Sequence, residues 1–248
     1  MLTGSFPPVI MLHHVTDDPA LDALKPYSIS RASFTRLLDV LEQVGYTTTV
    51  FCDVDFRKGK KVIITFDDCP KNLWDFALPE LQKRGMKAVF YMPTAYMGGH
   101  NDWDIQFGKP SVELMDEADI KRLSDIGMEV GSHSHHHVRL GELGAVEVAA
   151  NLRQSKQILE KITGKKILSV AYPFGSVPKE EELLLKDAGY EYGLSIYSPF
   201  QSRYCIRRFI YHDGDDAVRL KSKLSVRYRM MRVVNDKLLY LKSLRHGQ

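Results

Sequence analysis

Short apolar runs alternate with amphipathic segments along most of the chain, and this alternation limits the folds it can adopt. The run KVIITF (61–66) is largely β-branched, which is typical of a strand buried on both faces of a parallel sheet. Further strands are predicted at 8–12, 87–92, 128–132, 167–172, 192–196 and 204–211, and helices at 32–45, 72–85, 116–127, 142–162 and 179–189. Strands and helices that alternate at this spacing predict an α/β fold with a parallel sheet or barrel.

Length and composition limit the class of protein further. The 248 residues suffice for one large domain or two small ones with a substantial core. No apolar run approaches the ~18–20 residues of a membrane span, and the N-terminus lacks the pattern of a signal peptide. The three cysteines show no paired spacing, which favours a reducing compartment. We therefore expect a cytoplasmic protein.

The charge is distributed unevenly. Residues 217–248 carry nine Lys or Arg side chains against the single acid Asp236, whereas the rest of the chain is net negative. A main domain over 1–216 followed by a basic amphipathic helix over 217–248 is therefore predicted. The apolar positions that recur at helical spacing are Leu220, Leu224, Met231, Val234, Leu238 and Leu241.

This helix has three possible roles. It packs on the main domain and exposes a solvated face, or it docks peripherally on anionic headgroups at the inner face of the membrane. Nucleic-acid binding would instead show a steep salt dependence, and we predict no nucleic-acid partner. The oligomeric state is not predicted from the sequence.

Reactive side chains follow four of the predicted strands. Asp67 and Asp68 follow 61–66, His13 and His14 follow 8–12, a histidine cluster follows 128–132, and a YPFG segment ends the strand at 167–172. In parallel α/β folds, ligands bind at the carboxyl ends of the strands. One convergent site is the simplest hypothesis.

The histidine cluster GSHSHHH (131–137) favours a metal site. Neutral imidazole suits zinc and similar divalent ions. The cluster does not form a His-Glu-x-x-His motif, because Ser134 occupies the glutamate position, so a further ligand is needed. A carboxylate of the Asp67–Asp68 pair would supply that ligand and leave the other as a base beside an open position on the metal. Helix capping explains one aspartate at this position but not two.

Three motifs together resemble those of the polysaccharide deacetylases of carbohydrate esterase family 4. They are TFDD (65–68), HSHHH (133–137) and YPFG (172–175). The resemblance implies a deformed (β/α) barrel in which Asp67 is the catalytic base. It also implies that Asp68, His133 and His137 hold one divalent ion, with zinc expected and cobalt, nickel or iron as alternatives.

The same resemblance assigns the third motif. Tyr172 and Pro173 belong to one wall of the substrate groove, and the amide of Phe174 donates to the oxyanion. Trp103, in the polar stretch GGHNDWD, either stacks on a sugar ring or covers the core. The histidines at 14, 135 and 136 are expected to line the groove or support the ligands, because three protein ligands suffice for a catalytic zinc.

Two departures from the family pattern point to a circularly permuted subgroup. Ala171 stands where the family has an arginine that orients the base, and the late Leu-His motif that supplies the general acid is missing. The N-terminal VIMLHH resembles the first strand of the permuted members, so His13 is expected to be the acid. In that subgroup a late arginine replaces the missing one, and Arg208 in CIRRF is the best match.

The implied activity is removal of acetyl groups from N-acetylated sugars of a glycan or glycolipid. In the cytoplasm such sugars are carried on lipid pyrophosphates, so a lipid-linked sugar is one expected substrate. An O-acetyl esterase and a catalytically inactive carbohydrate-binding module remain the alternatives. Ala171 and the missing late histidine favour the inactive module, whereas acetate release would favour the enzyme.

Overall fold

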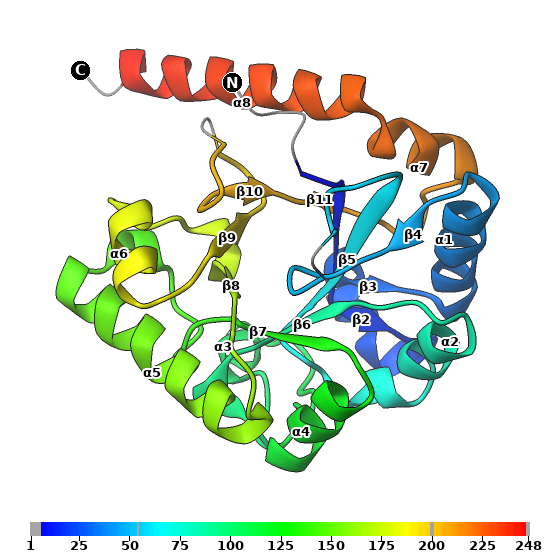
Figure 1. Cartoon of the computed structure of the whole chain (residues 1–248), viewed down its shortest axis with the longest axis horizontal. Helices are drawn as coiled ribbons and strands as arrows, with labels where there is room; N and C mark the ends of the chain where they lie inside the picture. The colour runs from blue at the N-terminus through cyan, green and yellow to red at the C-terminus, as the bar shows by residue number, and fades with distance from the viewer. Residues whose placement is uncertain (1–5, 54, 199–200, 247–248) are drawn as a thin grey trace.

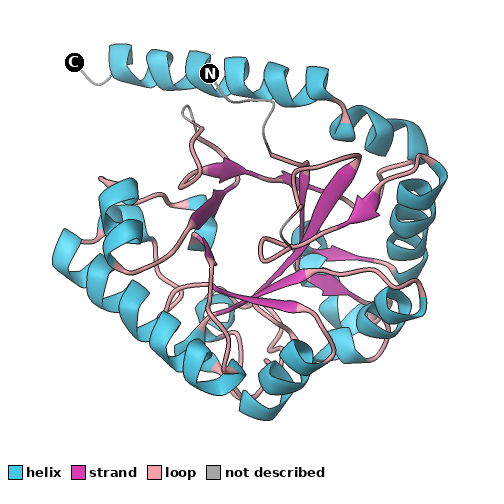
Figure 2. Cartoon of the chain, viewed as in Figure 1, coloured by secondary structure: helices cyan, strands magenta, loops and turns pink. Residues whose placement is uncertain are grey.

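The computed structural model describes residues 6–53, 55–198 and 201–246, and its side chains up to residue 238. A curved sheet of parallel strands forms the centre, and helices surround it (Figures 1 and 2). Along the sheet the order is β10-β9-β8-β7-β6-β5-β1-β11, and β4 pairs with β5 outside this path. The strands are β1 (Val9–Leu12), β4 (Thr47–Thr48), β5 (Lys61–Asp67), β6 (Val89–Met92), β7 (Glu129–Ser132), β8 (Ser169–Ala171), β9 (Tyr192–Ser195), β10 (Ile206–Arg207) and β11 (Phe209–Ile210), with β2 (His14–Val15) and β3 (Ser28–Ile29) as a separate pair.

The α-helices are α1 (Arg31–Gln43), α2 (Ala77–Lys83), α3 (Asp102–Ile105), α4 (Glu117–Asp125), α5 (Ala145–Thr163), α6 (Glu181–Asp187), α7 (Ala217–Leu224) and α8 (Val226–His246). Short 3-10 helices are η1 (Pro19–Tyr27), η2 (Lys71–Trp74), η3 (Thr94–Tyr96), η4 (Leu140–Glu142) and η5 (Pro173–Gly175). The predicted α/β fold with a parallel sheet is confirmed, as is the Asp116 cap of α4, which forms a capping box with Asp119.

Alternation along β5 divides the core into two layers. Ile64 and Phe66 belong to the cluster between the sheet and the helices, whereas Ile63 belongs to a second cluster inside the barrel. Since successive side chains of a strand point to opposite faces, Asp67 has the same orientation as Ile63. Asp67 therefore points into the mouth of the barrel.

The predicted strand at 204–211 is wrong as a single strand. It divides into β10, which pairs with β9, and β11, which pairs with β1, so one short segment joins the two edges of the sheet. Arg208 lies at the change of partner, and its amide donates to the Ser195 carbonyl at 2.9 Å. A strand that must leave one edge and reach the other cannot keep one set of hydrogen-bond partners.

Two predicted helices are also divided. The helix at 72–85 becomes η2 followed by α2, because Pro79 lacks an amide donor and is tolerated only in the first turn. The closing helix divides into α7 and α8 at Ser225, whose backbone is extended. Within this region Leu220 and Leu224 are buried, but Met231, Val234 and Leu238 are exposed. The predicted single apolar stripe is therefore wrong as a packing surface, and the side chain of Leu241 lies outside the described residues.

Candidate metal centre and catalytic cleft

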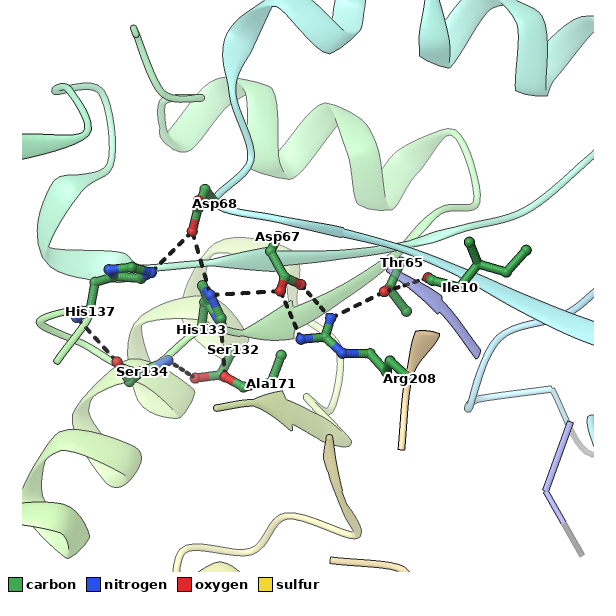
Figure 3. A network of polar contacts seen from close by, with 10 residues as sticks. All are labelled: Ile10, Thr65, Asp67, Asp68, Ser132, His133, Ser134, His137, Ala171 and Arg208. Carbon is green, nitrogen blue, oxygen red and sulfur yellow. Dashed lines mark hydrogen bonds and ion pairs between the residues drawn. The ribbon is translucent and has the colours of Figure 1, made fainter. Parts of the chain in front are cut away.

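Two strands, β5 and β7, bring four of the predicted site residues together at their carboxyl ends. Asp67 is the last residue of β5 and Asp68 follows it, while His133 and His137 follow β7 (Figure 3). These four side chains line one open cleft. The convergence expected from the strand ends is therefore present in the structure.

Asp68, His133 and His137 form a compact set of ligand atoms. The Oδ1 atom of Asp68 lies 3.4 Å from Nε2 of His133 and 3.2 Å from Nε2 of His137. One ligand atom from each residue lies within 4.8 Å of the others, and all three residues are buried. One carboxylate and two imidazoles match the donor set of a catalytic zinc site that keeps an open position.

Hydrogen bonding shows that this set suits a cation. Nδ1 of His133 lies 2.8 Å from the Ala171 carbonyl, which can only accept, so Nδ1 carries the proton. Burial lowers the pKa of His133 and lowers that of His137 to about 3, so both rings are neutral at neutral pH. The lone pair of His133 Nε2 therefore faces the Asp68 carboxylate, whose Oδ1 is buried without a hydrogen-bond partner.

Two acceptors that face each other repel unless a cation lies between them. The second nitrogen of His133 is held by a carbonyl, as in most metal-bound histidines. The residues present thus fit a divalent ion.

Asp67 has a cation of its own. Nη1 and Nη2 of Arg208 donate to its two carboxylate oxygens at 2.5 Å and 2.7 Å, and Arg208 is almost completely buried. Nη1 also donates to Thr65, whose hydroxyl donates to the Ile10 carbonyl. Burial raises the pKa of Asp67, but the Arg208 guanidinium and His133 lower it by a larger amount. The pKa of Asp67 therefore lies well below its usual range.

The space beneath Arg208 depends on a glycine. Tyr91 lies inside the barrel, where its ring centre is 5.7 Å from the guanidinium carbon of Arg208 and its hydroxyl contacts Ser169. A Cβ atom at Gly131 would lie 2.3 Å from the Tyr91 ring. Gly131 thus allows Tyr91 to fill the barrel below the Asp67–Arg208 pair.

Backbone strain is concentrated in the loops of the cleft. Six non-glycine residues in the described part of the chain have a positive φ, and only Glu180 lies away from the site loops. The other five are Asp68, Cys69, Ser134, His137 and Phe174. Such conformations cost on the order of 1–3 kcal/mol each and persist where surrounding contacts hold them. The amides of Ser134 and His137 are held by the hydroxyls of Ser132 and Ser134.

The histidines at the end of β1 differ in exposure. His13 is half-buried and lines the cleft, and its ring centre lies 5.3 Å from that of Tyr27. Burial lowers the pKa of His13, against the opposing charges of Asp68 and Asp67. His14 is buried, and its pKa is lowered to about 3, mainly by burial. Both histidines line the cleft, and His13 is the more exposed of the two.

The residues of the third motif lie in different environments. The ring of Phe174 is partly exposed, lines the cleft and lies 4.8 Å from that of His137. Tyr172 adjoins the cleft wall, but its side chain is fully buried and its hydroxyl donates to the Tyr204 carbonyl at 2.7 Å. Pro173 is buried in η5. The substrate-binding role of Tyr172 stays a prediction; its hydroxyl is engaged with the Tyr204 carbonyl.

Trp103 supports the metal centre from the side. It is 7% exposed, and its ring centre lies 3.9 Å from that of His137 and 4.9 Å from that of Tyr96. Of the two predicted roles, this placement matches the one in which Trp103 covers buried residues. Trp103 also lines the cleft, although little of its side chain is exposed.

Three aromatic residues at the cleft were missed by the sequence analysis. Tyr27, Phe107 and Tyr197 line the cleft and are exposed, Phe107 by 74%. They come from η1, from the segment after α3 and from the segment after β9. Each is an isolated aromatic in its own stretch of sequence, so no local pattern marks them as neighbours.

Comparison with known proteins agrees with the site. The family model described as polysaccharide deacetylase matches residues 55–193. A poly-beta-1,6-N-acetyl-D-glucosamine N-deacetylase of Staphylococcus aureus is 23% identical over 209 residues, which cover 77% of this chain and 70% of that protein. The first curated relatives are matched over 63% to 70% of their own length.

Solved structures share the fold. The Streptococcus pyogenes deacetylase PplD in complex with acetate is 18% identical, with a TM-score of 0.74, over 88% of this chain and 98% of its own. IcaB from Ammonifex degensii is 21% identical, with a TM-score of 0.74, over 89% of this chain and 97% of its own. The expected deformed (β/α) barrel is thereby confirmed.

Proposed function

Because the chain belongs to the polysaccharide deacetylase family, we propose that it is a metal-dependent enzyme that removes acetyl groups from N-acetylated sugars of a glycan. The observation that carries this proposal is the pairing of two adjacent carboxylates with different partners in one cleft. Asp67 is bound to Arg208, and Asp68 lies against His133 and His137. The named activity of the Staphylococcus aureus relative supports the N-acetyl substrate.

Asp68, His133 and His137 would hold the ion, and zinc is the proposed metal because the donors are two imidazoles and one carboxylate. When bound, such an ion polarises an acetyl carbonyl and lowers the pKa of water. Trp103 excludes solvent from one side of His137, and the Ala171 carbonyl fixes the orientation of His133. These contacts would keep the ligand atoms convergent.

Asp67 is the proposed base. Its low pKa keeps it charged, and the two hydrogen bonds from Arg208 fix the plane of the carboxylate. Arg208 would thus take the part of the arginine that is absent at Ala171. We propose that the Phe174 amide stabilises the developing oxyanion, a contribution of ~3–4 kcal/mol for such a donor.

His13 is the proposed acid, in keeping with the permuted arrangement in which the first strand supplies it. Its lowered pKa leaves the imidazole neutral at rest, so it must gain a proton during the reaction before it protonates the departing amine. Asp67 and Asp68 both favour its protonated form. His14→Ala is a matched comparison for His13→Ala, since its buried ring comes from the same strand end.

The rim of the cleft favours a sugar chain as substrate. Tyr27, Phe107 and Tyr197 are exposed aromatic side chains that line the cleft, which suits contact with the apolar faces of sugar rings. A lipid-linked sugar and a cytoplasmic location are further proposals, which rest on the sequence.

Acetate release tests this function. The full chain loaded with zinc should release acetate from N-acetylglucosamine oligomers, and a chelator should abolish the release. Asp67→Asn should retain the metal and lower kcat by ~10²–10⁴. His13→Ala should lower kcat within the same range, whereas His14→Ala should not. Acetate release from O-acetylated sugars alone would indicate the esterase, and sugar binding without any release would indicate an inactive module.

A further inference from the structure

The outward face of α8 is apolar. Five of its residues are each 51–56% exposed; they lie at steps of three or four positions, apart from one adjacent pair, and so share the side of the helix away from the barrel. We call them the α8 stripe: Val226, Met230, Met231, Val234 and Leu238. A helix at the surface of a globular domain normally presents its polar side to solvent, so this exposure is unusual.

The inward face of α8 is polar and fixes the orientation of the helix. Arg229 donates to the Phe6 carbonyl, and Arg232 donates to the carbonyls of Arg208 and Ile196. Asp236 lies 2.7 Å from Arg207. In Figure 1, α8 lies along the side of the barrel where β10 and β11 meet. These contacts use the polar side of α8 against the barrel and leave the apolar stripe outside.

Exposed cations lie near the two ends of the stripe. Arg227 and Lys237 of α8 are exposed beside it, and Arg219 and Lys221 of α7 are exposed in the preceding helix. Over the described side chains of residues 217–238, the single acid is Asp236, whose side chain is 13% exposed and faces Arg207. The surface that meets the stripe is therefore expected to be both apolar and negatively charged.

We propose that the α8 stripe docks on an anionic lipid surface, with its apolar side chains among the acyl chains and Arg227 and Lys237 at the phosphates. An apolar face bordered by basic side chains is the pattern of a helix that lies in the membrane interface. No helix in the described ranges has the length and apolar character of a membrane span. A second copy of the chain is a poorer occupant, since two stripes face to face would bring cations against cations.

Vesicle flotation with the full chain tests this docking. The parent protein should float with vesicles of phosphatidylglycerol and phosphatidylcholine and not with phosphatidylcholine alone. The double variant Met230→Ser/Val234→Ser should bind at least about tenfold more weakly, because two apolar anchors are lost. Val146→Ser is the matched control, since Val146 of α5 is 84% exposed outside the stripe, and it should bind as the parent does. Equal binding of the parent and the double variant would overturn the proposal.

A charge-reversal variant separates the role of the cations. Arg227→Glu/Lys237→Glu should abolish binding to anionic vesicles at moderate salt while leaving acetate release from a soluble oligomer unchanged. Arg229 and Arg232 are unsuitable for this purpose because both donate hydrogen bonds to main-chain carbonyls outside α8. Equal flotation with neutral vesicles would contradict the proposal. So would a dimer in light scattering that the Met230→Ser/Val234→Ser variant abolishes, because the stripe would then bind a second copy.

Discussion

Asp67 and Asp68 are adjacent in the chain and lie in the same cleft, yet they have opposite electrostatic environments. Arg208 and His133 outweigh burial at Asp67 and bring its pKa below the usual range. Burial raises the pKa of Asp68, and the nearby charge of Asp67 raises it further, against His13 and His133. The protein supplies a permanent cation to one carboxylate and leaves the other to an exchangeable one.

This difference separates the two functions of the site. Asp67 is charged and oriented whether or not an ion is bound, because Arg208 is part of the fold. Asp68, His133 and His137 form a group that could hold a metal ion, and binding of such an ion would stabilise their convergence. Removing a metal ligand and removing Arg208 should therefore have distinguishable effects.

The largest effect is expected for His133→Ala. With two ligands left, the site should lose its zinc, and acetate release should fall to background. Metal analysis after gel filtration measures the loss directly. His136→Ala is the matched control, because the exposed His136 belongs to the same cluster but not to the ligand set, and it should keep one ion per chain. Stoichiometric zinc in His133→Ala would show that the ligand set is misassigned.

Arg208→Met should lower kcat by about 100-fold or more at neutral pH while the zinc is retained. Burial raises the pKa of Asp67, and without the Arg208 guanidinium less remains to counteract this effect. A larger fraction of Asp67 would then be protonated, and a protonated carboxyl cannot act as the base. The acidic limb of kcat/KM against pH should therefore move to higher pH. Arg208→Lys, which keeps the charge but not the paired hydrogen bonds, should move it less. An unshifted limb in Arg208→Met would mean that Asp67 is not the titrating base.

Arg232→Ala tests whether α8 supports the base. Arg232 binds the carbonyls of Arg208 and Ile196, so its loss should let the Arg208 segment shift and lower kcat by about tenfold with little change in KM. Arg232→Lys should restore part of the activity, and Arg227→Ala on the outer face should leave it unchanged. If kcat of Arg232→Ala equals that of the parent, α8 does not contribute to the placement of Arg208.

The smallest effect concerns a buried carboxylate at the opposite end of β7. Glu129 has neither an arginine partner nor a metal site, and burial raises its pKa from 4.5 to about 7. The folded state therefore holds a proton that the unfolded state releases between these values, so the free energy of unfolding falls as pH rises through this window. Glu129→Gln keeps an acceptor for the Cys52 amide and should remove this pH-dependent fall in the free energy of unfolding.

Denaturant unfolding at pH 5 and pH 8 measures the effect of Glu129→Gln. The free energy of unfolding of the variant, relative to that of the parent, should be higher at pH 8 than at pH 5 by on the order of 2 kcal/mol. A gain that is equal at pH 5 and pH 8 would contradict a raised pKa for Glu129.

The parts of the site that lie in short, continuous sequence patterns could be predicted from the sequence. The end of the β-branched run at 61–66 places Asp67 and Asp68, and the spacing of His133 and His137 places two imidazoles after one strand. The resemblance to known motifs supplied Arg208. Local sequence patterns alone would not have identified Arg208, because its contact with Asp67 joins residues 141 positions apart and depends on the order of the strands in the sheet.

Other features could not be predicted, for physical reasons. Helical periodicity identifies an apolar stripe in α8 but does not show which side faces the barrel. The inward side is decided by Arg229 and Arg232, which donate to main-chain carbonyls that the sequence does not reveal. The change of partner at Arg208 likewise follows from the closure of the sheet rather than from the local sequence.

The position of Arg208 in the segment that joins the two edges of the sheet has a consequence for biosynthesis. A nascent chain contains every proposed metal ligand once residue 137 has been made, whereas the cation of Asp67 arrives about 70 residues later with β10 and β11. Contacts between distant residues form late in folding. We expect the chain to acquire affinity for its ion before it acquires an oriented base, so a ribosome-bound intermediate would take up metal while still unable to hydrolyse anything.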